Sequence, residues 1–147
     1  MTGASNSLRE GARLGFYVAT SIWIWLALVD AVAGEPFHTF HVLGGIPFFT
    51  VMHYVLNIAY GAAIVAVLQS TLRQPSLIGA LTMGFLIIEF GFAMITILFS
   101  QVGLGELAWL RVFGGNLVGL AVAFLVLRRK YPLEAMLRYN EDEEAKA

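Results

Sequence analysis

The sequence predicts an all-α integral membrane protein, a single up-down bundle of four transmembrane helices. Hydrophobic residues make up 59% of its 147 residues and charged residues 13%, against about 25% charged residues in an ordinary soluble domain. Four apolar stretches are each long enough to cross a hydrocarbon core, which needs about 20 helical residues. Polar and apolar residues do not alternate along these stretches, so the sequence does not favour a transmembrane barrel.

The first two helices are predicted over residues 14–33 and 47–68. Residues 7–10, Ser-Leu-Arg-Glu, have the spacing of a capping box, which satisfies the first free amides of a helix. Residues 34–36, Gly-Glu-Pro, are expected to end the first helix. Pro47 suits the first position of the second helix, where its missing N–H leaves no hydrogen bond unmade.

The third and fourth helices are predicted over residues 77–102 and 109–127. Residues 1–130 then form one transmembrane domain. Residues 131–147 form a cytoplasmic tail, which is first amphipathic and then acidic. A short loop joins each pair of successive helices.

Basic residues predict the orientation, because lysine and arginine near helix ends are retained in the cytoplasm. If four helices alternate, nearly all of these residues fall on one side: Arg9, Arg13, Arg73, Arg128, Arg129 and Lys130. The opposite loops carry Glu35 and Glu106, and Arg111 is the one basic residue near them. We therefore expect a multi-pass protein of the cell membrane, an inner membrane in bacteria, with both termini in the cytoplasm.

Composition also argues against several classes of function. The net charge is −1 and no basic patch is present, which argues against a nucleic-acid partner. The absence of cysteine removes disulfides, iron–sulfur clusters and thiolate metal sites. No zinc-protease motif, phosphate loop or serine nucleophile elbow occurs, so the sequence implies no cofactor and does not favour an enzyme.

Polar side chains inside the predicted helices are candidates for a functional site, because inserting an ionisable group into the bilayer costs roughly 2.5 to 3.5 kcal/mol. The candidates for a ligand site or an ion pathway are Glu89, His53, Asn57, Asn116 and Asp30. His53 and Asn57 lie four residues apart, hence on one helix face, and Glu89 is expected near mid-membrane. The alternative is that these groups only join helices by hydrogen bonds and bind nothing.

A metal site is a further hypothesis. His38 and His41 lie three residues apart in an outer loop, and with His53 they would offer three nitrogen ligands to zinc or copper. Phe37 and Phe40 alternate with them. The competing interpretation is therefore an interfacial loop whose aromatic rings lie at headgroup depth.

Small residues indicate where helices approach each other closely, since lipid offers no hydrophobic drive for helix association. The glycines predicted to pack helices are Gly61, Gly84, Gly91, Gly115 and Gly119. The last two form a GxxxG pair, which serves contacts within the chain or with a second copy. Trp23 and Trp25 must face opposite sides of the first helix, so we expect at least one to meet lipid or a partner protein.

Two functional hypotheses follow. The first is a non-catalytic accessory or self-associating subunit of a membrane complex, whose partners are the lipid bilayer and a membrane protein or a second copy. The second is a small proton- or cation-coupled transporter or channel that uses Glu89 with His53, Asn57 and Asn116. An enzyme or metal carrier that uses the three histidines is a third option.

Overall fold

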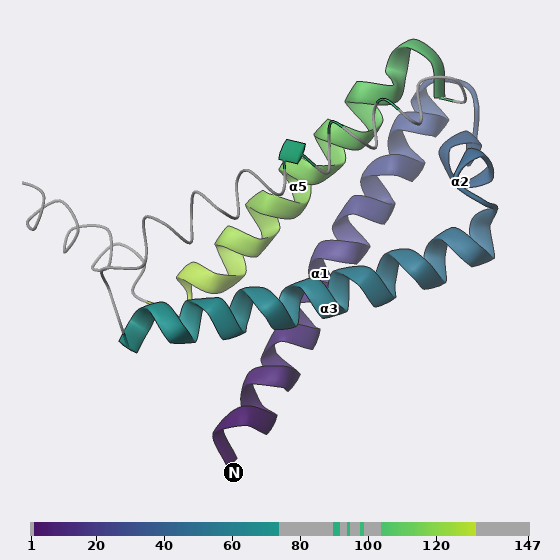
Figure 1. The fold of residues 1–147 in the computed structure, drawn as a ribbon. Helices are drawn as coiled ribbons and strands as arrows, with labels where there is room; N and C mark the ends of the chain where they lie inside the picture. Colours follow the sequence, from purple (N-terminus) through teal and green to yellow (C-terminus); the bar gives the residue numbers. More distant parts are fainter. Residues whose placement is uncertain (1, 74–89, 92–93, 95–97, 99–103, 132–147) are drawn as a thin grey trace, which may run out of the picture.

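The computed structural model describes residues 2–73, 90–91, 94, 98 and 104–131, and its secondary structure there is helical (Figure 1). In chain order the elements are α1 (Thr2–Val32), α2 (His38–Val42), α3 (Ile46–Arg73), the 3₁₀ turn η2 (Gly105–Leu107) and α5 (Ala108–Arg128). Three of them, α1, α3 and α5, are long and apolar enough to cross a membrane. This part of the chain is a membrane-type helical bundle.

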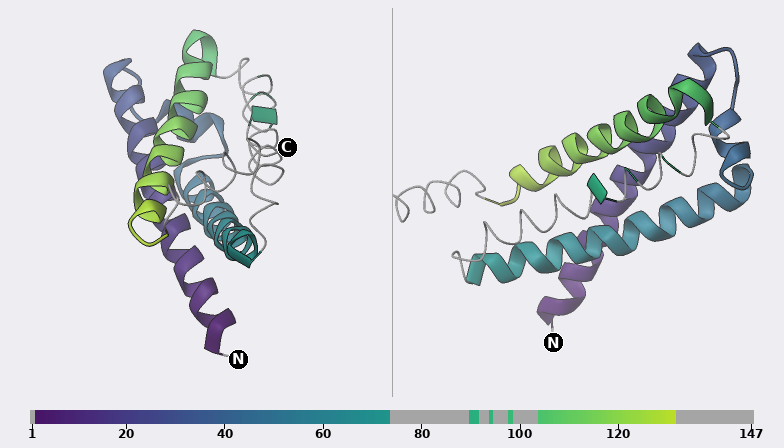
Figure 2. Two further views of the ribbon diagram at one scale, coloured as in Figure 1. Left: turned by 90° about the vertical axis from the view of Figure 1, so that its left-hand side faces the viewer. Right: turned by 45° about the horizontal axis from the view of Figure 1, so that its top comes forward.

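Helix α1 packs against both α3 and α5 and runs antiparallel to them. At one end Ser7 donates a hydrogen bond to Gln69 of α3, and Lys130, just beyond α5, contacts Glu10. At the other end Arg111 of α5 forms an ion pair with Asp30 of α1. Figures 1 and 2 agree that α5 lies alongside α1, whereas α3 crosses it. We call the end with Asp30 the outer end, following the predicted orientation.

The predicted helices over residues 47–68 and 109–127 are confirmed, since α3 and α5 contain them. The first predicted helix, residues 14–33, is too short, because α1 begins at Thr2. The capping box was wrong: Ser7 lies inside α1, and its hydroxyl donates to Oε1 of Gln69 at 2.6 Å. Packing against α3 and the contact with Lys130 stabilise these polar first turns, a contribution that local sequence does not contain.

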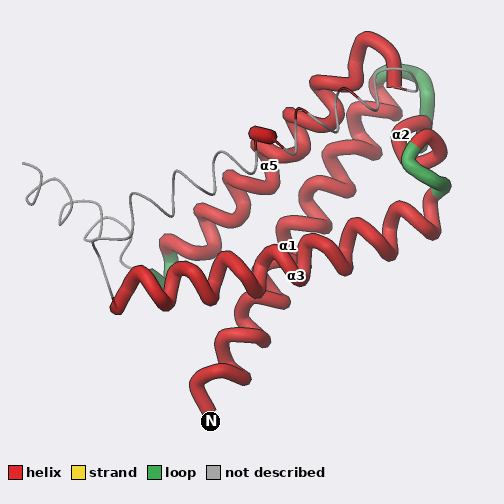
Figure 3. The backbone as a smooth tube through the Cα atoms, in the orientation of Figure 1, coloured by secondary structure: helices red, strands yellow, loops and turns green. Residues whose placement is uncertain are grey.

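The helix predicted over residues 77–102 lies outside the described residues, apart from Phe90, Gly91, Met94 and Leu98. The predicted tail lies outside them too, from residue 132 onward. The four-helix count therefore remains a prediction. Figure 3 shows that the described loops are short and that two of them flank α2 at the outer end.

Glycine brings α1 and α3 into backbone contact where they cross. A Cβ added at Gly15 would lie 2.1 Å from the carbonyl oxygen of Asn57, and one at Gly61 would lie 2.3 Å from that of Gly11. No side chain fits between such surfaces, so these positions require glycine. Beside the crossing, Leu14, Val65 and Ala123 form the small buried core that joins α1, α3 and α5.

The glycines of α5 also serve contacts within the chain. A Cβ at Gly119 would meet Ile22 and Val18 of α1, and one at Gly115 would meet Ile22. Of the other predicted packing positions, Gly91 has no described residue within 4 Å of an added Cβ, and Gly84 lies outside the described residues.

Candidate functional site

A cavity of about 550 Å³ lies among α1, α3 and α5. Its walls are mainly apolar. Each of the three helices contributes side chains to it, among them Val18, Ile22, Met52, Leu56, Phe113 and Leu120. This volume falls within the range of about 300 to 1,000 Å³ that is typical of small-molecule sites.

Three of the polar residues selected from the sequence line this one cavity: His53 and Asn57 from α3, and Asn116 from α5. Glu89 lies outside the described residues, so its predicted place beside them is untested. Asp30 does not line the cavity, and its side chain forms an ion pair with Arg111 at the outer end of the bundle.

The His53 ring is fixed by one stacking contact and by hydrogen bonds at both of its nitrogens. The ring stacks on Phe49, with centroids 5.1 Å apart and an interplanar angle of 15°. Its Nε2 lies 3.1 Å from the carbonyl oxygen of Ala19 on α1, so Nε2 carries a proton and donates it. In the neutral ring Nδ1 is then an acceptor, and Nδ2 of Asn57 lies 3.3 Å from it. The imidazole thus ties α3 to α1.

The carboxamides of Asn57 and Asn116 have hydrogen-bonding atoms without a partner among the described residues. Nδ2 of Asn57 also donates to the carbonyl oxygen of His53 at 2.8 Å, but its Oδ1 accepts no hydrogen bond within the described part of the chain. The Asn116 side chain makes none at all to the described residues. Both side chains are half-buried and line the cavity, so their free polar atoms can bond to a polar occupant there.

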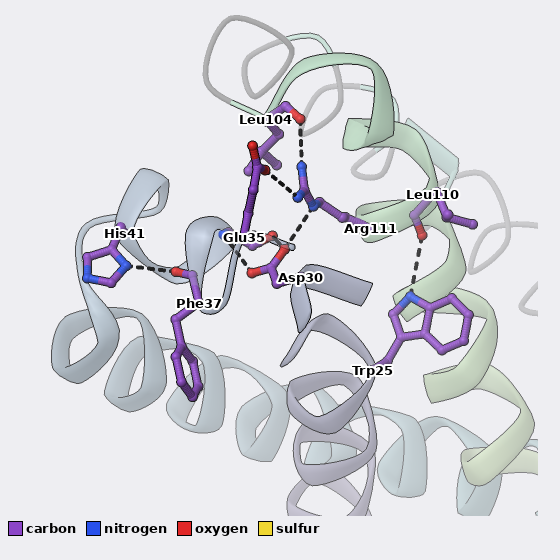
Figure 4. Close-up of polar contacts among 9 residues, drawn as sticks. Trp25, Asp30, Glu35, Phe37, His41, Leu104, Leu110 and Arg111 are labelled. Atoms are coloured by element: carbon purple, nitrogen blue, oxygen red, sulfur yellow. Dashed lines mark hydrogen bonds and ion pairs between the residues drawn. The ribbon is translucent and has the colours of Figure 1, made fainter. Parts of the chain in front are cut away.

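A buried charge cluster closes the outer end (Figure 4). Nε of Arg111 lies 2.8 Å from Oδ1 of Asp30, and the two side chains are 1% and 0% exposed. This contact is an ion pair without the alignment of a hydrogen bond. The other guanidinium nitrogens donate to the carbonyl oxygen of Leu104 at 2.7 Å and to the carboxylate of Glu35, which is 55% exposed, at 3.1 Å.

Asp30 also fixes α2. Its Oδ2 accepts a hydrogen bond from the backbone N–H of Thr39 at 2.8 Å, and its Oδ1 accepts one from the Thr39 hydroxyl at 2.7 Å. The first N–H groups of a helix have no partner inside the helix, so this carboxylate caps α2 from α1. Thr39 and Arg111 both line the outer end of the cavity. The cluster therefore forms part of the cavity wall.

The histidines do not come together as a metal site. His38 and His41 lie on α2, and Nδ1 of His41 donates to the carbonyl oxygen of Phe37 at 2.8 Å. His53 faces the interior, with Nε2 occupied by Ala19. In the described part of the chain, no three His, Asp or Glu side chains lie where they could hold one metal ion.

Both tryptophans of α1 pack against neighbouring helices. The Trp23 indole donates to the Thr50 hydroxyl of α3 at 3.1 Å, and the Trp25 indole donates to the carbonyl oxygen of Leu110 of α5 at 3.4 Å. They do face opposite sides, as the spacing predicts. Both are half-buried, so each ring is mainly a helix contact within the chain.

A second cavity, of about 690 Å³, lies at the inner end and is lined in part by the polar residues Asn6, Glu10, Gln69 and Lys130. Nζ of Lys130 lies 2.5 Å from Oε2 of Glu10. This hydrogen bond raises the pKa of the exposed Lys130.

Sequence reasoning missed the Asp30–Arg111 pair, although a signal was present. Each residue lies about one turn from the outer end of its predicted helix, so two opposite charges have matching depth. It also missed Gly11 and Gly15, a GxxxG pair, because the predicted helix began at Leu14. Arg9 and Arg13 made that segment resemble a cytoplasmic lead.

Comparisons with protein-family models, with curated proteins and with solved structures found no match. The functional inference therefore rests on the cavity and its side chains. The geometry favours binding, because the cavity joins apolar walls to unpaired amides.

Proposed function

We propose that this chain is a small proton- or cation-coupled transporter or channel of the cell membrane, with both termini in the cytoplasm. The observation that supports it is that Oδ1 of Asn57 and the carboxamide of Asn116, which have no hydrogen-bond partner among the described residues, line one cavity among three membrane-type helices. Polar residues that only join helices would be expected to bond to each other. Asn57 of α3 and Asn116 of α5 instead face the cavity.

Glu89 is the proposed coupling site. A carboxyl group at mid-membrane has to be protonated, paired or in contact with water, and such groups commonly mark proton and ion pathways. In this proposal Glu89 binds the proton or cation, while His53, Asn57 and Asn116 line the path.

Flux measurements in liposomes test the proposal. The full-length chain is reconstituted, and proton and cation uptake are followed with entrapped dyes for wild type, Glu89→Gln and Asn116→Leu. We expect Glu89→Gln to abolish flux and Asn116→Leu to reduce it. Leu125→Ala is the matched control, because Leu125 is exposed on α5 and is not in the cavity lining. Equal flux from wild type and Glu89→Gln contradicts the proposal, and so does the absence of flux from all forms, wild type included.

A non-catalytic accessory or self-associating subunit is the second candidate. Large apolar side chains are exposed on α3 and α5, among them Phe48, Val51, Val55 and Phe124, and lipid, another subunit or a second copy can cover them. The case for self-association is weaker than the sequence indicated, because Gly61, Gly115 and Gly119 pack within the chain.

Native mass spectrometry of protein extracted from its own membranes separates the two candidates. Co-migrating subunits of other sequence favour the accessory role. A chain that appears alone favours transport, and a homo-oligomer fits transport or self-association, which the liposome flux then separates.

A further inference from the structure

We infer that the cavity among α1, α3 and α5 binds an uncharged amphiphile, a molecule with a hydroxyl head group and an apolar body. The hydroxyl lies at Asn57 and Asn116, and the apolar body lies along the helix walls. This inference rests on the proposed function in one respect: it names the class of molecule that the transporter would carry. Binding itself does not depend on transport.

The walls select for an apolar body. The side chains of α1 that reach the cavity are aliphatic, and those of α3 and α5 add Phe49, Met52 and Phe113. A polar solute of similar size would lose its hydration along these walls without gaining hydrogen bonds. An alkyl chain or a similar apolar body gains contact there instead.

The hydrogen-bonding groups select the head. His53 is not available, because both ring nitrogens already have partners. Oδ1 of Asn57 can only accept a hydrogen bond, whereas the Asn116 carboxamide can donate and accept. A hydroxyl group both donates and accepts, so one hydroxyl can donate to Asn57 and accept from Asn116.

The charges select against an ionised head. Of the described residues that line the cavity, Arg111 is the one with a charge. Its guanidinium is already engaged by Asp30, Glu35 and the carbonyl oxygen of Leu104. A carboxylate head would find no available cation among these residues, and an ammonium head no available carboxylate. Among the described residues, an ion moved there would find no free group of opposite charge to replace its hydration.

A matched series of probes tests this inference. The full-length chain is placed in lipid nanodiscs and titrated with radiolabelled 1-dodecanol, dodecane, dodecanoate and dodecylammonium, with empty nanodiscs as the blank. We expect saturable binding of dodecanol above the blank, with the other three weaker. Asn116→Leu, and Asn116→Ala as a second variant, should weaken dodecanol binding by about three- to tenfold, the value of one hydrogen bond. Leu125→Ala should leave binding unchanged.

Three results would each overturn the inference. Dodecane binds as tightly as dodecanol, either charged probe binds more tightly than dodecanol, or dodecanol shows no saturable binding above the blank. Failure of the transport proposal looks different: dodecanol binds and Asn116→Leu weakens it, yet liposomes show no coupled flux. Flux without any dodecanol binding overturns the inference alone.

Discussion

Asp30 and Arg111 are charged side chains that the described helices bury completely. Each neutralises the charge of the other, and each also binds a second element. Asp30 caps α2, and Arg111 donates a hydrogen bond to the carbonyl oxygen of Leu104, just before η2. A buried ion pair need not stabilise a fold more than apolar residues of the same size, but removal of one partner leaves an unpaired buried charge. The cluster therefore fixes how the outer ends of α1, α2 and α5 meet.

The pair predicts a strongly non-additive double-mutant cycle. Asp30→Leu and Arg111→Met should each lower the free energy of unfolding by about 3 to 5 kcal/mol, and the double variant by less than the sum. Unfolding of the purified protein in detergent, followed by circular dichroism, measures all four forms. Additive losses would show that the two charges do not compensate each other.

Lys130 gives a prediction for pH. Its hydrogen bond to Glu10 raises its pKa, so the folded state binds this proton more tightly than the unfolded chain does. The resulting stabilisation is fully present below the ordinary lysine pKa and is lost only as the pH rises through the raised value. Glu10→Gln should lower the Lys130 pKa toward its ordinary value.

Side-chain NMR of labelled lysine measures this shift, and Lys146 in the same chain serves as the internal reference. If Lys130 titrates at the same pH in wild type and Glu10→Gln, the contact does not persist in solution.

At the scale of elements, the crossing of α1 and α3 depends on the absence of side chains. Gly11 and Gly15 of α1 meet Gly61 and Ala62 of α3 backbone to backbone. Such contacts gain dispersion energy over a large area, which is the main source of helix association in lipid. Gly15 and Gly61 of this crossing also line the cavity.

Gly15→Ala should separate the two helices. The new methyl group would lie 2.1 Å from the carbonyl oxygen of Asn57, and backbone cannot move aside as a flexible side chain can. We expect a loss of at least about 1 to 3 kcal/mol, the typical cost of overpacking, measured by unfolding in detergent. Gly91→Ala is the control, since no described residue lies within 4 Å of an added Cβ there. Similar stability of the two variants would refute backbone contact at the crossing.

At the scale of the whole molecule, the described contacts place the ends of the helices in two groups. Asp30, Arg111 and the start of α3 lie at one end, and Gln69, Glu10 and Lys130 lie at the other. The positive-inside rule assigns the second group to the cytoplasm. Orientation, and the number of crossings, remain predictions.

Cysteine labelling tests the orientation directly, because the natural chain has no cysteine. Glu106 and Ser70 are exposed at opposite ends, so single variants Glu106→Cys and Ser70→Cys report one side each. In intact spheroplasts an impermeant maleimide should label position 106, and it should label position 70 only after permeabilisation. The reverse pattern would invert the topology.

Local sequence was enough to predict the membrane class, the presence of two of the long helices and the set of polar residues inside apolar segments. Those conclusions depend on local properties: the length of apolar runs, Pro47 at a helix start, and the cost of polar groups in lipid. The helices over residues 47–68 and 109–127 were predictable for that reason.

Which groups meet could be seen only in the folded arrangement of the helices. The pairing of Asp30 with Arg111, the early start of α1 and the glycine crossing depend on which faces of distant helices touch. The structure also shows a difference between two polar residues. Both ring nitrogens of His53 have hydrogen-bond partners, whereas the Asn116 carboxamide has none among the described residues. Both look alike in the sequence as polar residues inside apolar helices. Their difference comes from neighbours far along the chain, and hydropathy, a local quantity, carries no information about these.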